Sequence, residues 1–138
     1  LARDLDVEPA FVYKRRDSNS GDVSVSGVNA DVRGREVVIY DDMIRTGSSL
    51  VQAAKAYLDA GASAIHAVAS HLVLPAQALD RLRSSGVFQS ISGTDSHPAS
   101  QQLANEPGAI TSVAPLFARA LEKSADGKVI PMARHSRP

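Results

Sequence analysis

The sequence predicts an α/β fold with a central, mainly parallel β-sheet flanked by helices. Residues 37–40 (Val-Val-Ile-Tyr) are β-branched or aromatic without polar alternation, which is typical of a strand buried on both faces of a parallel sheet. Apolar residues at helical spacing, from Leu50 to Leu58, follow this strand closely. Predicted strands and helices then alternate along the chain, and this alternation favours a parallel sheet.

The remaining elements are predicted from periodicity and from residues that begin or end helices. We expect the helix after the central strand to begin at Ser48 and to end at Gly61, because glycine suits the position just after a helix. Pro75 fits the first turn of a second helix. The predicted strands are residues 10–13, 23–28, 37–41, 65–69, 87–91 and 110–113; the predicted helices are residues 48–61, 75–82 and 115–124; residues 14–21 form a polar loop.

Length and composition exclude several classes of protein. At 138 residues the chain is long enough for one domain, which we place at residues 1–127 with a frayed tail at 128–138. Its 15 basic and 15 acidic residues balance, so no overall charge favours nucleic acid. Without cysteine it has neither disulfides nor thiolate metal ligands, which fits a reducing cytoplasm. Apolar runs are too short to span a membrane, and no signal peptide opens the chain.

Two carboxylates follow the predicted central strand. In open α/β sheets the ligand crevice lies outside the carboxyl ends of the strands, so we expect Asp41 and Asp42 to lie at the edge where ligands bind. Carboxylates only accept hydrogen bonds, which suits the vicinal hydroxyls of a sugar. The two side chains need not form a single clamp, since successive strand residues point to opposite faces.

The small residues Thr46, Gly47, Ser48 and Ser49 then lead into the helix. The first amides of a helix have no internal partner and, with the helix dipole and nearby hydroxyls, form an anion site. Each charge-assisted hydrogen bond contributes about 1.5 to 3 kcal/mol. Alone, the acids could be a solvated edge and the serines an ordinary N-cap. The order of strand, acids, glycine turn and helix favours a site for a phosphorylated sugar.

This segment resembles a known motif. It is similar to the phosphoribosyl diphosphate (PRPP) binding motif of type I phosphoribosyltransferase folds, and most closely to that of ribose-phosphate pyrophosphokinases (PRPP synthetases), which reads Asp-Asp-Met-Ile-Asp-Thr-Gly-Gly-Thr. The chain departs from it at Arg45, where the family has Asp, and at Ser48 and Ser49, where it has Gly and Thr. Other segments resemble the same family: residues 12–16, 27–34, 69–74, 93–98 and 112–118.

The resemblance implies a reaction and a set of roles. The family transfers a diphosphate group from ATP to the 1-hydroxyl of ribose 5-phosphate with Mg²⁺, which is held mainly through the substrates. It implies that Asp41 and Asp42 hold the ribose hydroxyls and that Thr46 to Ser49 hold the 5-phosphate. Arg45, a cation beside this loop, is a further candidate for ribose-phosphate binding. The resemblance also implies that Lys14 and Arg16 are catalytic and stabilise charge on the phosphoryl groups, on a loop that closes over the substrate.

Two features of the family are missing from the chain, so alternative functions stay open. We find neither the N-terminal half that helps to build the ATP site nor a Pro-Asp-X-Gly-Gly segment, so we expect a C-terminal portion that forms a homo-oligomer or associates with a missing N-terminal half. The alternatives are a phosphoribosyltransferase that consumes PRPP, or a non-catalytic regulatory subunit, which Arg45 supports. His71 could face the ligand or cap a turn, and the histidine spacing forms no recognisable metal cluster.

Overall fold

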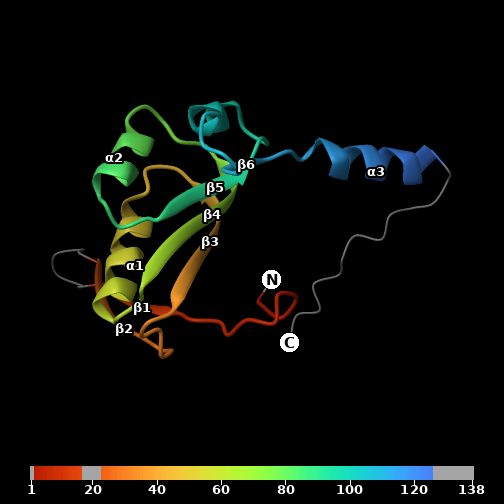
Figure 1. Cartoon of the computed structure of the whole chain (residues 1–138). Helices are drawn as coiled ribbons and strands as arrows, with labels where there is room; N and C mark the ends of the chain where they lie inside the picture. Colours follow the sequence, from red (N-terminus) through yellow and green to blue (C-terminus); the bar gives the residue numbers. More distant parts are fainter. Residues whose placement is uncertain (1, 17–22, 126–138) are drawn as a thin grey trace.

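The computed structural model describes residues 2–16 and 23–125, with the backbone alone at 13–16, 23–26 and 125. The predicted tail after residue 127 and the predicted loop at 17–21 lie outside these ranges. Ten elements follow one another (Figure 1): β1 Val12–Arg16, β2 Val23–Val28, β3 Glu36–Ile44, α1 Ser48–Asp59, β4 Ala64–Leu72, α2 Ala78–Ser84, β5 Ser90–Thr94, the 3-10 helix η1 Pro98–Leu103, β6 Ile110–Thr111 and α3 Ala114–Ala125.

The main sheet is parallel, as predicted. Its strands lie in the order β3-β4-β5-β6 and every pair in it is parallel. β1 and β2 form a separate antiparallel pair. The fold is therefore α/β with a mainly parallel sheet, and the α1, α2 and η1 connections let successive parallel strands enter at the same end.

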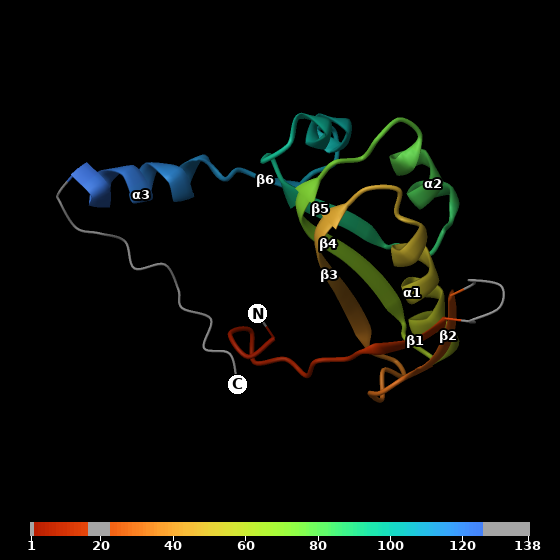
Figure 2. The same cartoon turned by 180° about the vertical axis from the view of Figure 1, so that it is seen from behind.

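The core lies between the sheet and the helices α1 and α2, which cover the same face in both views (Figures 1 and 2). A second cluster joins the far end of α1 to β1 and β2. There Tyr57 is buried and donates a hydrogen bond from its hydroxyl to the Ala10 carbonyl at 3.2 Å. Burial raises the pKa of Tyr57. The buried residues of the main cluster are Ile44, Leu50, Ala67, Ala69, Leu72, Leu74, Ala78, Leu79, Leu82, Ile91, Leu103 and Ala109.

The prediction that the strand at residues 37–40 is central and buried on both faces is wrong for the part of the chain that the structure describes. β3 is an edge strand of the sheet. Val38 is 61% exposed and Tyr40 51% exposed, because no described helix covers the face opposite α1 and α2. The third helix, α3, leads away from β6 and leaves Leu116 and Phe117 exposed as well. The described chain therefore leaves an apolar run exposed at an edge of the sheet.

Several predicted boundaries also shift. β3 continues to Ile44 because β4 pairs with it as far as Leu72. Lys14 to Arg16, predicted as loop, pair with β2. The second helix begins at Ala78 rather than Pro75, since Gln77 adopts a left-handed conformation with φ of 67°. β5 spans Ser90–Thr94, three residues later than predicted, and η1 was not predicted. No helix in the described ranges is long and apolar enough to cross a bilayer.

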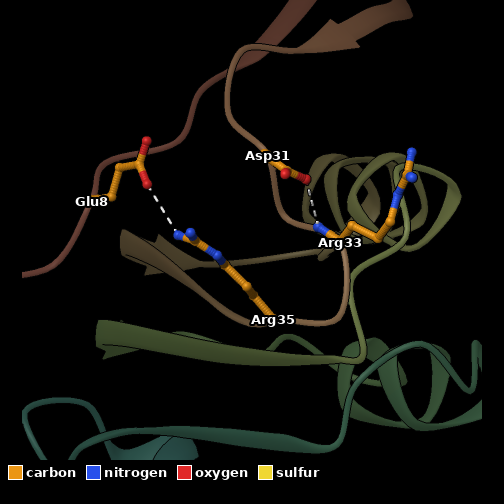
Figure 3. A network of polar contacts seen from close by, with 4 residues as sticks. All are labelled: Glu8, Asp31, Arg33 and Arg35. Atoms are coloured by element: carbon orange, nitrogen blue, oxygen red, sulfur yellow. Dashed lines mark hydrogen bonds and ion pairs between the residues drawn. The ribbon is translucent and has the colours of Figure 1, made fainter.

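Charged side chains at the start of β3 connect it to the N-terminal segment (Figure 3). Arg35 Nη1 donates a hydrogen bond to Glu8 Oε2 at 3.0 Å, and both side chains are exposed. In the preceding turn the backbone N–H of Arg33 donates to Asp31 Oδ1 at 3.2 Å. Exposed ion pairs contribute at most about 1 kcal/mol. These contacts therefore orient the segment before β1 more than they stabilise the domain.

Gly93 offers a test of the packing between β4 and β5. A Cβ at this position would lie 2.5 Å from the Ala69 carbonyl oxygen and 2.7 Å from Leu72 Cγ. We expect Gly93→Ala to lower the free energy of unfolding by about 1 to 3 kcal/mol, as overpacking does. Urea unfolding followed by circular dichroism measures this. Ser92→Ala, on the same strand, should change the stability by no more than about 0.5 kcal/mol. A Gly93→Ala variant as stable as the wild type would contradict the close approach.

Candidate functional site

The candidate site lies where β3 ends and α1 begins. Only residues 45–47 separate Ile44 from Ser48. Gly47 makes this short turn possible, because its φ of 74° is left-handed and a Cβ would lie 2.8 Å from Leu82 Cγ. A residue with a side chain would be strained here and would clash with α2. The first turn of α1 is thereby held against the carboxyl end of the sheet.

The donors of this turn face a shallow cavity. The first helical hydrogen bond runs from Val51 N to the Gly47 carbonyl at 2.9 Å, so the preceding amides have no helical acceptor. Gly47 occupies the N-cap and no side chain caps the helix, so neither serine is the N-cap. The cavity has a volume of about 180 Å³ and is lined by Asp41 and residues 43–50. Its exposed hydroxyls and unpaired amides can bind an anion.

The two acids lie in β3 itself rather than after it. Asp41 Oδ1 accepts a hydrogen bond from the Asp42 backbone N–H at 2.9 Å. Asp41 lines the cavity together with Arg45, whereas Asp42 does not. Both carboxylates are exposed, and within the described ranges no side chain is bonded to Asp42. The structure therefore gathers Asp41, Arg45 and residues 46–49 around one cavity, with Asp42 beside it.

The described residues offer no complete metal cage. They contain no group of three or more His, Cys, Asp or Glu side chains that could hold a metal ion. Asp41 and Asp42 nevertheless present exposed oxygen ligands. Mg²⁺ commonly takes one or two carboxylates and completes its shell with water and substrate phosphates. The residues present fit that open type of site.

Lys14 and Arg16 are placed only by their backbone, in β1. The hairpin packs on the far half of α1, where Val12 and Val28 lie against the cluster that contains Tyr57. The side chains of Lys14 and Arg16, and the loop proposed to close over the substrate, lie outside the described part of the structure. Their catalytic roles stay a prediction.

A polar network at the ends of β4 and β5 was not assigned from the sequence. Ser70 accepts at its carbonyl from Thr94 Oγ1 at 2.6 Å and from Ser96 Oγ at 3.0 Å. The hydroxyls of Tyr40 and Ser70 lie 2.8 Å apart. Ser96 also contacts His71. The clue in the sequence is the run of Thr, Asp, Ser and His after the strand, but side chains there can equally be solvated.

Asp95 belongs to the same edge and fixes the start of α3. Its carboxylate accepts from Ser112 Oγ at 2.6 Å and from Val113 N at 2.8 Å. The Ser112 hydroxyl and then the Val113 amide lower the pKa of Asp95, because both bonds favour the charged carboxylate. This anchor ties β5 to the segment that leads into α3.

Comparison with known proteins identifies similar chains. A family model described as "Phosphoribosyl transferase domain" matches residues 1–96. The chain is 36% identical over 127 residues to a ribose-phosphate pyrophosphokinase of Caldanaerobacter subterraneus subsp. tengcongensis, covering 92% of this chain and 40% of that protein. It is 42% identical over 116 residues to a ribose-phosphate pyrophosphokinase of Methanopyrus kandleri, covering 84% of this chain and 37% of that one.

A solved structure shares the fold. The crystal structure of phosphoribosylpyrophosphate synthetase from Mycobacterium smegmatis matches with a TM-score of 0.73 and 28% identity, over 91% of this chain and 40% of that chain. The chain thus spans about two fifths of the length of the relatives that it matches.

Asp95 gives a test that depends on pH. Ser112→Ala removes the hydroxyl that contributes most to lowering the Asp95 pKa, so we expect that pKa to rise towards its ordinary value. Carboxyl ¹³C NMR titration measures the rise. A lowered carboxylate pKa stabilises the fold above the ordinary value near 4 and loses this effect as the pH falls through the lowered pKa. The variant should therefore lose less stability than the wild type on acidification below about pH 4. An unchanged Asp95 pKa would contradict the bond.

Proposed function

Since the chain belongs to the family of phosphoribosyl transferase domains, we propose that it is the ribose-phosphate-binding part of a ribose-phosphate pyrophosphokinase. The observation that carries the proposal is the left-handed turn at Gly47, which holds the free amides of α1 and the Asp41 carboxylate around one cavity. A phosphate needs donors and sugar hydroxyls need acceptors, and this cavity offers both. The similarity to enzymes named ribose-phosphate pyrophosphokinase supports the choice.

The phosphate end of the ligand would lie at the start of α1. The hydroxyls of Thr46, Ser48 and Ser49 and the first amides of the helix would donate to its oxygens. Arg45 lines the same cavity and adds a positive charge that this anion would favour. Asp41 and Asp42, on the strand, would accept from the ribose hydroxyls. In this pose the sugar extends from the helix towards the sheet edge.

The proposed reaction transfers a diphosphate group. The 1-hydroxyl oxygen of ribose 5-phosphate forms a bond to the β-phosphorus of ATP and gives up its proton to solvent, the bond from that phosphorus to the α,β-bridging oxygen breaks, and AMP leaves. Lys14 and Arg16 would stabilise the charge on the transferred group. Mg²⁺, when bound, would neutralise phosphate charge, with Asp41 and Asp42 as the carboxylates within reach.

Activity is expected to need more than this chain. The chain spans about two fifths of its relatives, and its sheet has an exposed apolar face at Val38 and Tyr40. We propose that a further segment or a second subunit covers this face and completes the ATP site. The isolated chain should then bind ribose 5-phosphate and turn over poorly.

Two alternatives have support of their own. Arg45 stands at a position of the cavity where the synthetase motif carries an acid, which favours a regulatory subunit that binds the sugar phosphate without catalysis. The family model that matches residues 1–96 is named for phosphoribosyl transfer, which favours an enzyme that joins PRPP to a base.

Binding of ribose 5-phosphate tests the cavity. We expect Asp41→Asn and Asp42→Asn each to weaken binding about tenfold or more, because each removes a charged acceptor worth about 1.5 to 3 kcal/mol. Asp59→Asn is the matched control, since Asp59 is an exposed acid at the far end of α1 and should change nothing. Isothermal titration calorimetry measures the affinities. A wild-type chain that does not bind ribose 5-phosphate would overturn the proposal.

Turnover separates the enzyme from its alternatives. We expect AMP formation from ATP and ribose 5-phosphate, followed by a coupled assay, to be weak with the chain alone and robust once the rest of the protein is supplied. Robust turnover by the chain alone would refute the need for a further segment. Binding without turnover in the longer protein would favour the regulator, and Arg45→Asp should then restore AMP formation if Arg45 is the cause. Consumption of PRPP with a base would identify a transferase.

A further inference from the structure

His71, at the carboxyl end of β4, is held in one orientation with one ring nitrogen free. Its Nδ1 lies 2.8 Å from Ser96 Oγ, and the side chain is exposed. Among the described residues, no side chain or backbone group is bonded to its Nε2. Because the ring is held in place and Nε2 is unpaired in the described chain, this nitrogen can form a hydrogen bond with a ligand from solution.

An irregularity in the sheet sets this orientation. β4 and β5 pair through Ala69 and Gly93, and next through His71 and Thr94, so Ser70 is an extra residue between the two pairs. Such bulges re-aim the side chains beside them. Thr94 Oγ1 and Ser96 Oγ both donate to the Ser70 carbonyl, which holds the bulge in place.

The contacts of Ser96 allow either neutral tautomer of the His71 ring. A serine hydroxyl has one hydrogen to donate and lone pairs to accept with. Ser96 Oγ lies 3.0 Å from the Ser70 carbonyl oxygen and 2.8 Å from His71 Nδ1, and it accepts from Thr94 Oγ1 at 2.8 Å. When the Ser96 hydrogen goes to the Ser70 carbonyl, His71 Nδ1–H donates to Ser96; when it goes to His71, Nδ1 accepts and Nε2 carries the ring hydrogen. In either tautomer Nε2 can form a hydrogen bond with a sugar hydroxyl, because a hydroxyl both donates and accepts.

His71 lies beside the cavity that binds the proposed ligand. It pairs with Met43 of β3, and Met43 lines the cavity together with Asp41. Because neighbouring strands lie about 4.8 Å apart, His71 is one strand away from the two acids. In the proposed pose the sugar extends from α1 towards this edge of the sheet, where His71 lies.

His66 provides an internal comparison. It also lies on β4 and its Nδ1 is also 2.8 Å from a serine hydroxyl of the neighbouring strand, Ser90. Its Nε2, however, lies 3.4 Å from Glu36 Oε2, at the opposite end of the strand. The two histidines are held alike, but only at His71 is the second nitrogen left open.

We propose that His71 is a further ligand-binding residue, whose Nε2 forms a hydrogen bond with a ribose hydroxyl of the sugar phosphate. This inference rests on the proposed function, because it places the phosphate at Thr46 to Ser49 and the sugar between Asp41 and His71. It assigns to β4 a part in sugar recognition, so that the sugar is held from two neighbouring strands.

The test compares two ligands and two variants of the 138-residue chain. By calorimetry, His71→Ala should weaken ribose 5-phosphate binding about fivefold, the change that one neutral hydrogen bond of about 1 kcal/mol produces. Inorganic phosphate, which has no sugar, should bind His71→Ala as it binds the wild type. His66→Ala is the matched control and should bind both ligands normally. Circular dichroism checks that each variant folds.

Each outcome supports or overturns a separate statement. If the wild type does not bind ribose 5-phosphate, the proposed function fails. If the wild type and His71→Ala bind it equally well, the inference fails while the proposed function stands. Equal weakening for both ligands would show that His71 contacts the phosphate, against the inference. Should His71→Ala not fold, ¹⁵N NMR of the wild type decides: ribose 5-phosphate should shift the His71 Nε2 signal, phosphate should not, and an unmoved signal overturns the inference.

Discussion

The parallel pairing of β3 with β4 is the constraint on which the rest of the structure depends. It runs from Glu36 opposite Ala64 to Ile44 opposite Leu72. Because both strands point the same way, their polar carboxyl ends meet at one edge of the sheet. Asp41 and the loop into α1 belong to the first strand, and Ser70 and His71 to the second. Residues that are separated by the whole of α1 along the chain therefore lie one strand apart.

Glycine residues allow the segments at this edge of the sheet to pack closely against one another. Gly47 lets α1 start against α2, and Gly93 lets β5 pass close to Ala69 and Leu72. Serine and threonine hydroxyls then satisfy the backbone groups that a bulge leaves unpaired. The resulting site consists almost entirely of exposed side chains and backbone amides. Such a site gains affinity and specificity mainly when a ligand or further polypeptide excludes water from it.

One face of the sheet exposes apolar residues of β3 in the described chain. Val38 and Tyr40 are apolar or aromatic residues on an edge strand, and the chain spans about two fifths of the proteins that it matches. The periodicity of residues 37–40 indicated a strand buried on both faces, which the described chain does not provide. Burial depends on what packs against a strand, and that partner is not encoded in the strand itself.

The sequence by itself determined the α/β class, the order of most elements and the loop of the candidate site, because these depend on local periodicity and on residues such as Gly47 and Ser48. It misplaced the start of α2 and of β5, where backbone conformation at Gln77 and pairing with β4 set the boundaries. Only the tertiary structure decided which acid lines the cavity, that β3 lies at an edge, and that His71 is held beside the acids. These depend on contacts between residues far apart in the chain, for which the sequence pattern carries no local signal.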